Sequence, residues 1–413
     1  MTAVEVVDEK RVRTIRPRRR PRKPVRRTLI AIHRWSALIL GIVLVIQTTS
    51  GAILLYHAEL FRTQHASFYR HTEGPPVIDL EGAVALVRSE DPGFDAGWVG
   101  TDGGVFVVGN RDYTAAYAVD PGTGRLNEEV DLTGGVLGWL VNLHDCAFGC
   151  LRYSGALPML NEQAPLIDIT WAATILVVLG LLLVMLTVSG TIIWWPSLKR
   201  LSHGLRVRWR KGRFARDRDL HNVIGILAVP FLLMWGITGV TIEWPAAERV
   251  VLRAMGGEAN EQTDDVYVPR PASLPRPVSI SEATTVALRE APGRLAYLML
   301  PSESTPYYRA AVAGAYSPYE HRAFYSGDVL VYINASDSSD IRSDTSHRRP
   351  LANTFYAKVF EPAHFGWLVN PWWRLVWLIF GLAPLALAIT GLSTWLFRRN
   401  TRRRKRAPAP RSR

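Results

Sequence analysis

Four long apolar stretches dominate the pattern of the chain. They cover residues 29–56, 169–195, 221–244 and 375–397, and each is long enough to cross a hydrocarbon core of about 30 Å as a helix. Aromatic side chains gather at their ends, where amphipathic rings favour the headgroup level. These are Trp35, Tyr56, Trp194, Trp195, Trp244, Trp372, Trp373 and Trp395. The pattern therefore predicts an α-helical integral membrane protein with four transmembrane helices.

The two long segments between the spans, residues 57–168 and 245–374, have a different pattern. In each, a stretch with helical periodicity, residues 80–90 or 280–290, ends at a Pro-Gly pair. Alternating, β-rich sequence follows, and in the first segment it is broken by turn residues at 121–124. A helix packed on a short antiparallel sheet is the natural arrangement of such elements. We therefore expect each segment to form a small α+β module.

Charge indicates the orientation of the spans. The chain has 49 Lys and Arg residues, and 29 of them lie in three short segments beside the spans: 11 in residues 1–28, 9 in 196–220 and 9 in 398–413. The positive-inside rule predicts that these segments are cytoplasmic and that both modules are extracytoplasmic. We therefore expect a multi-pass protein of the cell (inner) membrane with both termini in the cytoplasm. The lipid bilayer explains the basic runs without a nucleic acid partner.

The second half of the chain repeats the pattern of the first. Each odd-numbered span has a histidine near its start and a Ser-Gly or Thr-Gly pair near its end, and each even-numbered span has another such pair. The members are His33 with Ser50-Gly51, His221 with Thr238-Gly239, Ser189-Gly190 and Thr390-Gly391, and residues 80–93 likewise parallel 280–293. The agreement predicts a tandem duplication of one unit, helix, outer module, helix, with the two copies in parallel orientation.

Several motifs resemble a known family. Residues 80–120 lead to the turn Asp120-Pro121-Gly122-Thr123-Gly124, and this order resembles the PepSY domain, which often closes on Asp-Pro-x-Thr-Gly. With the histidines and the four Ser-Gly or Thr-Gly pairs, the chain is similar to the PepSY-associated transmembrane family over residues 28–398. Two departures distinguish the modules. Residues 334–337 read Asn-Ala-Ser-Asp where the second turn motif would fall, and a long insertion separates His144 from the second span.

Four histidines are candidate cofactor ligands, because ionisable groups at span ends are functional candidates by default. His33 and His221 open the outward-going helices at the cytoplasmic face, and His144 and His364 precede the returning helices at the outer face. Neutral imidazoles on both sides of a flat cofactor suit haem iron, so each pair is a candidate axial set. The chain lacks Cys-x-x-Cys-His, which predicts non-covalent haem b. Interfacial imidazoles that bond headgroups or helix ends are the alternative, and His57 is a rival outer ligand.

Glycines accompany both histidine pairs. Gly51 and Gly239 lie about 25 Å along their helices from the cytoplasmic histidines and hence near the outer pair. Gly190 and Gly391 lie near the cytoplasmic pair. The missing side chains either admit a porphyrin or serve plain helix–helix packing.

Cys146 and Cys150 are the two cysteines of the chain, and they follow His144 outside the membrane, where thiols can oxidise. A structural disulfide, two free thiols and a redox-active pair all fit their spacing. The sequence has no glycine-rich nucleotide loop and no HExxH motif. We therefore expect any electron donor to be a separate cytoplasmic protein or reduced cofactor.

Two functions from different classes follow. The first is a transmembrane b-type haem protein that passes electrons from a cytoplasmic donor to an extracytoplasmic acceptor. The family resemblance implies a ferric chelate or siderophore as the acceptor, and hence a haem-dependent ferric-siderophore reductase in iron uptake. The second is a non-enzymatic PepSY membrane module that binds peptide or regulates a protease or sensor. The repeat-matched histidines favour the first, and a spectrum of the purified protein discriminates between the two.

Overall fold

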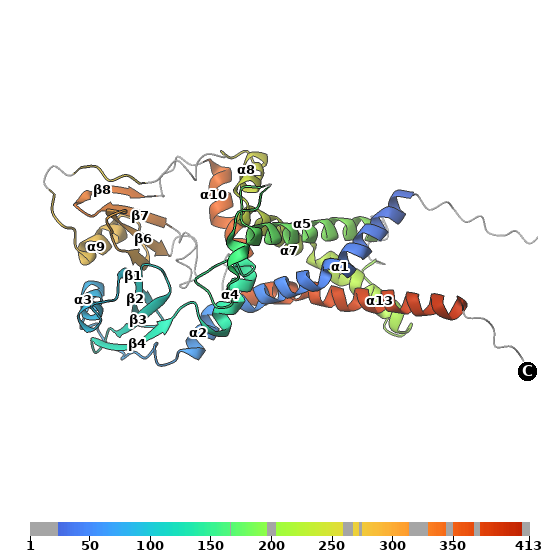
Figure 1. Cartoon of the computed structure of the whole chain (residues 1–413), viewed down its shortest axis with the longest axis horizontal. Coiled ribbons are helices and arrows are strands. Elements are labelled where there is room, and N and C mark those ends of the chain that lie inside the picture. The colour runs from blue at the N-terminus through green and yellow to red at the C-terminus, as the bar shows by residue number, and fades with distance from the viewer. Residues whose placement is uncertain are drawn as a thin grey trace, which may run out of the picture.

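Figure 1 shows a bundle of long helices with a β-sheet domain at one end. The computed structural model describes residues 24–165, 167–195, 204–258, 267–271, 275–313, 329–343, 350–366 and 372–406. Most of the predicted basic tail 1–28 lies outside these ranges, as do residues 196–203 of the basic loop and 407–413 of the last segment.

The four predicted spans are confirmed as helices long and apolar enough to cross a membrane. They are α1 (Pro24–Leu54), α5 (Trp171–Trp194), α7 (Arg213–Glu243) and the consecutive helices α12 (Trp373–Gly381) and α13 (Ala383–Arg406). At the end of the bundle away from the sheet, α7 and α13 extend beyond the predicted bounds 221 and 397. The apolar pattern marks only the part of each helix that suits hydrocarbon, so it misses these polar turns.

Buried carboxylates explain why α7 begins before its apolar stretch. Asp217 accepts a hydrogen bond of 2.6 Å from Ser393 Oγ of α13. Asp219 pairs with Arg208, whose Nε and Nη2 donate to its two oxygens at 2.7 and 2.9 Å. Both carboxylates are therefore compensated although they are buried, and they fix the first turns of α7 to neighbouring segments.

Small residues let the spans approach closely. A β-carbon on Gly180 of α5 would lie 3.0 Å from the carbonyl oxygen of Gly236 and 2.7 Å from Val240, both in α7. A β-carbon on Gly381 of α12 would lie 3.1 Å from Ala52 of α1. Such contacts are typical of helix interfaces in membranes. Many apolar side chains of α1, such as Ile39, Ile42 and Ile46, are exposed, as expected of a helix face that contacts lipid.

The segment between α1 and α5 forms the first outer module. It contains α2 (His57–Gln64), α3 (Leu80–Glu90), the strands β1 (Ala96–Asp102), β2 (Val105–Asn110), β3 (Ala115–Asp120) and β4 (Arg125–Asp131), then α4 (Gly135–Cys146) and the short helix η1 (Pro158–Asn161). A helix followed by antiparallel strands is the predicted order of elements.

The segment between α7 and α12 forms the second module with the same order of elements. It contains α8 (Pro245–Ala254), α9 (Ile280–Glu290), β5 (Arg294–Met299), β6 (Tyr307–Ala313), β7 (Val329–Asn334) and β8 (Asp337–Ser343). Then come α10 (Leu351–Phe355), the π-helical turn η3 (Tyr356–Phe360) and α11 (Glu361–His364).

The two modules share one sheet, which the sequence did not predict. Its eight strands are ordered β4-β3-β2-β1-β5-β6-β7-β8, and every neighbouring pair is antiparallel. The modules join where Val99 of β1 pairs with Leu298 of β5. Each four-stranded half thereby covers an edge of the other, and an unpaired edge would otherwise be open to aggregation.

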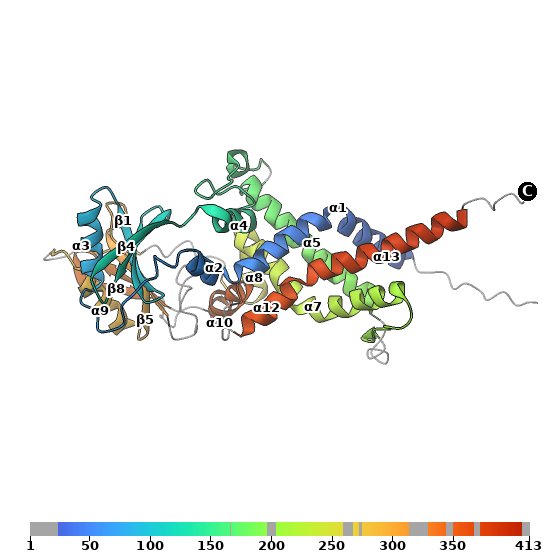
Figure 2. The ribbon, with the colours of Figure 1, turned by 90° about the horizontal axis from the view of Figure 1, so that it is seen from below.

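The sheet has two different faces. On one, α3 and α9 pack through buried residues such as Val87 and Val286. On the other, Phe61 of α2 and Leu137 of α4 pack against Val107 and Ala118 of the strands. Figure 2 shows α2 and α4 between the sheet and the long helices, so this second face is directed toward the helix bundle.

The Asp-Pro-x-Thr-Gly turn has a structural role. The Asp120 carboxylate accepts hydrogen bonds from Thr72 N and Oγ1, Gly122 N and Thr123 Oγ1, at 2.8 to 3.0 Å. Burial raises the pKa of Asp120, but the hydrogen bonds outweigh it and lower the pKa to about 2. In the second module Asn334 replaces this aspartate. Its Nδ2 donates to Arg270 O at 2.8 Å and its Oδ1 accepts from Ser336 N, so an amide ties the turn to the preceding segment.

Candidate functional site

The cytoplasmic histidine candidates face each other across the bundle. His33 of α1 and His221 of α7 have ring centroids 6.5 Å apart, and their ring planes are inclined at 86°. They lie 188 residues apart in sequence. The fold brings them together because α1 and α7 start at the same end of the bundle, away from the sheet (Figure 1).

The outer candidates form a second pair at the sheet end of the bundle. His144 lies near the end of α4 and His364 ends α11. Their ring centroids are 6.4 Å apart with an interplanar angle of 48°. The two pairs thus have nearly the same ring separation, although His33 and His221 belong to long candidate spans and His144 and His364 to short helices of the modules.

The hydroxyl of each Ser-Gly or Thr-Gly pair contacts one of the histidines at Nδ1. The four contacts are Ser189 Oγ with His33 at 2.9 Å, Thr390 Oγ1 with His221 at 3.1 Å, Ser50 Oγ with His144 at 3.1 Å and Thr238 Oγ1 with His364 at 2.7 Å. Backbone carbonyls of Leu387 and Gln47 also lie 3.1 and 2.9 Å from Nδ1 of His221 and His144. A carbonyl only accepts, so the contact with Leu387 places the proton on Nδ1 of His221 and leaves the lone pair on Nε2. Nδ1 of His144 contacts both an acceptor, Gln47 O, and a donor, Gln47 Nε2 at 3.2 Å, and the shorter contact is with the acceptor.

The glycines of these pairs make room for the imidazoles. A β-carbon on Gly51 would lie 2.4 Å from Cε1 of His144, and β-carbons on Gly190 and Gly391 would lie 3.2 and 3.3 Å from Cε1 of His33 and His221. At Gly239 the distance to His364 Cε1 is an ordinary 3.7 Å. The histidine rings therefore lie over Gly51, Gly190 and Gly391, and that these glycines also admit a porphyrin stays a prediction.

Two further side chains position the outer pair, and sequence reasoning missed both. Gln47 Nε2 donates to the backbone carbonyl of His144 at 2.7 Å, and Trp235 Nε1 donates to that of His364 at 3.0 Å. Gln47 and Trp235 are separated by the same 188 residues that relate His33 to His221. The shared offset could have identified the two residues as equivalent. Their side chains, an amide and an indole, are chemically different, and the structure shows that each donates an N–H to the backbone carbonyl of an outer histidine.

His57, the rival outer ligand, lies at the start of α2, where its ring stacks on Phe61 with centroids 6.0 Å apart. The ring that faces His144 is that of His364. Cys146 and Cys150 form a disulfide with a Cα–Cα distance of 5.5 Å. This bond agrees with a disulfide rather than two free thiols, and a redox-active role of the pair stays a prediction.

The donor set suits a cofactor that brings its own ligands. Within the described ranges, no cluster of three or more His, Cys, Asp or Glu residues is arranged to hold a metal ion. A bare structural ion takes four protein ligands as a rule. Two opposed imidazoles with Nδ1 fixed instead match the axial needs of a planar macrocycle, whose own nitrogens fill the remaining positions.

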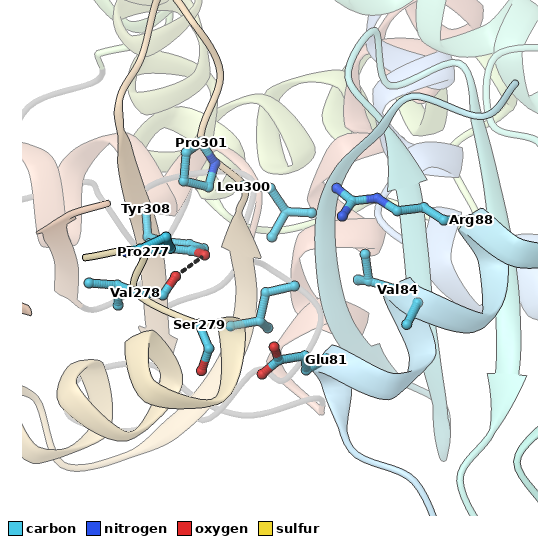
Figure 3. Close-up of a pocket in the computed structure, with 11 residues that line it drawn as sticks. Glu81, Val84, Arg88, Pro277, Val278, Ser279, Leu300, Pro301 and Tyr308 are labelled. Atoms are coloured by element: carbon cyan, nitrogen blue, oxygen red, sulfur yellow. Dashed lines mark hydrogen bonds between the residues drawn. The ribbon is translucent and has the colours of Figure 1, made fainter. Parts of the chain in front are cut away.

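A cavity of about 370 Å³ lies between α3 and the second module, at the face of the sheet that α3 and α9 cover (Figure 3). Glu81, Val84 and Arg88 of α3 line one side, and Leu300 and Tyr308 of the second module line the other. Val84 and Leu300 are already 1% and 4% exposed, so little apolar surface remains for a ligand to bury. The cavity therefore does not rival the histidine pairs as the functional site.

Among known families, the model of the PepSY-associated TM region matches residues 30–398 of the chain. No curated protein matches the chain significantly.

Proposed function

Because the chain belongs to the PepSY-associated transmembrane family and contains four candidate membrane spans, we propose that it carries electrons across the membrane. Its two histidine pairs are the proposed axial ligands of two haem b groups. His33 and His221 would hold one, and His144 and His364 the other. Haem b with two imidazole ligands supplies one-electron chemistry at its iron.

The separation of the paired rings is the observation that carries this proposal. An iron about 2 Å from one nitrogen of each ring, as in metal–imidazole bonds generally, holds two opposed ring centres roughly 6 Å apart. The observed 6.5 and 6.4 Å agree with this spacing. The hydroxyl contacts at Nδ1 orient each ring, and such outer partners raise the basicity of the ligating nitrogen.

The position of the pairs supports transfer across the membrane. Ser50, which contacts His144, follows His33 by 17 residues of α1, or about 25 Å of helix. One macrocycle cannot bridge that distance, so two in sequence are required. The basic segments favour the cytoplasm for the His33 end. A separate cytoplasmic donor would supply electrons there, and the other pair would pass them to an extracytoplasmic acceptor.

A ferric chelate or siderophore is the proposed acceptor, because the family resemblance implies iron. It would make the protein a haem-dependent ferric-siderophore reductase in iron uptake. We also infer that the chain arose by tandem duplication. Besides Gln47 and Trp235, the contacts of Gly180 with Val240 and of Gly381 with Ala52 are related by the same offsets of 201 and 188 that relate the motif pairs.

Spectroscopy of the purified protein tests the proposal. Protein from haem-replete cells should show the sharp reduced-minus-oxidised bands of low-spin haem b. His33→Ala and His221→Ala should each remove the same half of the haem, because each leaves one axial position empty. His144→Ala and His364→Ala should remove the other half, whereas the control His57→Ala should retain both. Full haem content in the four pair variants would overturn the proposal and favour the non-enzymatic PepSY module.

A further inference from the structure

Residues 147–161, which end with the short helix η1, form the first part of the segment between α4 and α5, and we call them the wedge. The disulfide between Cys146 and Cys150 closes its start. Asn142 of α4 is fully buried beneath it, accepts from Cys150 N at 3.2 Å, and donates to the carbonyl oxygens of Tyr153 and Ser154 at 3.3 and 3.2 Å. The wedge therefore has a fixed shape built around a satisfied amide.

Despite this rigidity, the wedge exposes large apolar side chains. Leu151, Leu157 and Met159 are 58%, 47% and 67% exposed, and Val136 and Trp139 on the adjoining side of α4 are 71% and 43% exposed. The two groups are continuous. The Trp139 ring lies 5.3 Å from that of Phe148 and directly over Gly155, whose built β-carbon would be 2.7 Å from Trp139 Cδ1. An apolar patch of this kind marks a surface that contacts a partner.

The position of the wedge along the axis of the spans indicates what that partner is. Gly149 packs on Ala172, to which a built β-carbon would come within 2.5 Å, and Ala147 and Leu160 pack with Ala172 and Leu176. Ala172 and Leu176 belong to the first turns of the membrane-spanning helix α5. Figure 1 shows α4 running across the ends of the spans, and Figure 2 shows the wedge beside the sheet-side end of α5. The exposed side chains are therefore level with the membrane surface.

We propose that the wedge and the exposed side of α4 insert into the headgroup region of the leaflet nearest the sheet, where they bind lipid. Interfacial segments bury their apolar side about 5–10 Å into this boundary. The patch continues directly into the lipid-facing start of α5, where Trp171 is 43% exposed. The second module has a counterpart, because α10 precedes His364 and exposes Leu351 and Phe355 at 84% and 46%.

The proposed lipid contact would also hold His144 in position. His144 follows Trp139 by about 1.4 turns of a helix with 3.6 residues per turn, so the two side chains leave α4 on nearly opposite sides. Lipid on one side of α4 thus holds His144 on the other at a constant height. This inference depends on the membrane spans and not on the proposed haem, so the two can fail separately.

Spin labels on the full-length protein in lipid nanodiscs test the proposal. We would label Met159→Cys and, as a matched control, Ser89→Cys at an exposed position of α3 on the far face of the sheet. The native cysteines are bonded to each other, so unmodified protein gives the labelling background. Relaxation by oxygen, which concentrates in lipid, relative to a water-soluble nickel chelate should be several-fold higher at 159 than at 89. Equal ratios at the two positions would overturn the proposal.

A second measurement leaves the chain unaltered. Phosphatidylcholine carrying a photoreactive diazirine in its acyl chain should label peptides that contain Leu157 and Met159 after irradiation in nanodiscs. The α3 peptide 80–90 should remain unlabelled. If the wedge is also unlabelled, the exposed patch is not a lipid surface and a protein partner must cover it.

Discussion

Gly51 leaves room for the His144 ring, since a β-carbon at this position would come within 2.4 Å of its Cε1. Real β-carbons do not approach other atoms so closely, so even a methyl group must displace the ring or the helix. The equivalent Gly239 is less constrained, because a β-carbon there would meet His364 Cε1 at 3.7 Å, an ordinary van der Waals distance. Sequence-equivalent glycines thus differ in what they tolerate.

We expect Gly51→Ala to lose the outer haem and Gly239→Ala to keep it. Haem content per protein should fall by about half in the first variant, because only one of the two pairs is disturbed. Quantitative haem extraction, with protein mass measured in parallel, checks this. Equal haem content in the two variants would mean that the contact over Gly51 does not control the position of His144.

The elements that depend on local pattern were predictable. The four spans and the histidines could be located because apolar length and a fixed offset are legible along the chain. The joining of the two modules into one sheet could not be predicted. The pairing of Val99 with Leu298 links strands about 200 residues apart, and each strand could equally have been an unpaired edge of its own module. The duplication, the orientation and the cofactor stay predictions.

The candidate site was predictable in its residues but not in their roles. The histidines and the Ser-Gly or Thr-Gly pairs were identified, yet the hydroxyl contact with Nδ1 depends on which helices become neighbours. The contact of Gly51 with the His144 ring was not predicted, because a missing side chain does not reveal which neighbour needs the space. Gln47 was overlooked because its function, a hydrogen bond to a backbone carbonyl, leaves no mark in composition.

Ser189→Ala and Thr390→Ala should each weaken the cytoplasmic site, and to a similar extent. Ser189 Oγ and Thr390 Oγ1 contact Nδ1 of His33 and His221 at 2.9 and 3.1 Å. Each ring also has a backbone partner, Leu186 for His33 and Leu387 for His221, so the two variants lose equivalent contacts. Loss of such an outer partner costs roughly 10–100-fold in affinity. Haem titration of the apoproteins against wild type measures the loss. Wild-type affinity in both variants would show that the hydroxyls do not orient the two rings.

Asp120→Asn should remove an acid-sensitive part of the stability of the outer domain. The folded state lowers the Asp120 pKa from 3.8 to about 2, a shift worth on the order of 2 kcal/mol. A depressed pKa stabilises the fold above pH 4, roughly, and the benefit disappears as pH falls toward 2. Unfolding of the full chain should therefore show a difference between wild type and variant at pH 7 that shrinks below pH 4. Asp112→Asn, at an exposed position of the same module, should show no such difference.

Reporter fusions test the orientation that the 11, 9 and 9 basic residues indicate. Fusions after residues 205 and 405 should be active as cytoplasmic reporters, and those after 100 and 300 as external ones. A cytoplasmic signal at 100 or 300 contradicts the orientation and would reverse the direction of electron flow in the proposed function.

Electron transfer through the two pairs should be vectorial, because they lie at opposite ends of the bundle about 25 Å apart. In proteoliposomes oriented with the basic segments inside, a reductant trapped in the lumen should reduce a membrane-impermeant ferric chelate outside. His144→Ala and His364→Ala should stop that reduction while the haem of the cytoplasmic pair still becomes reduced, since they remove the exit. His33→Ala and His221→Ala should instead leave the outer haem oxidised, since they remove the first acceptor. His57→Ala is the matched control, because this histidine stacks on Phe61 at the start of α2. Chelate reduction that persists in the outer-pair variants would contradict the relay and leave the histidines a structural role.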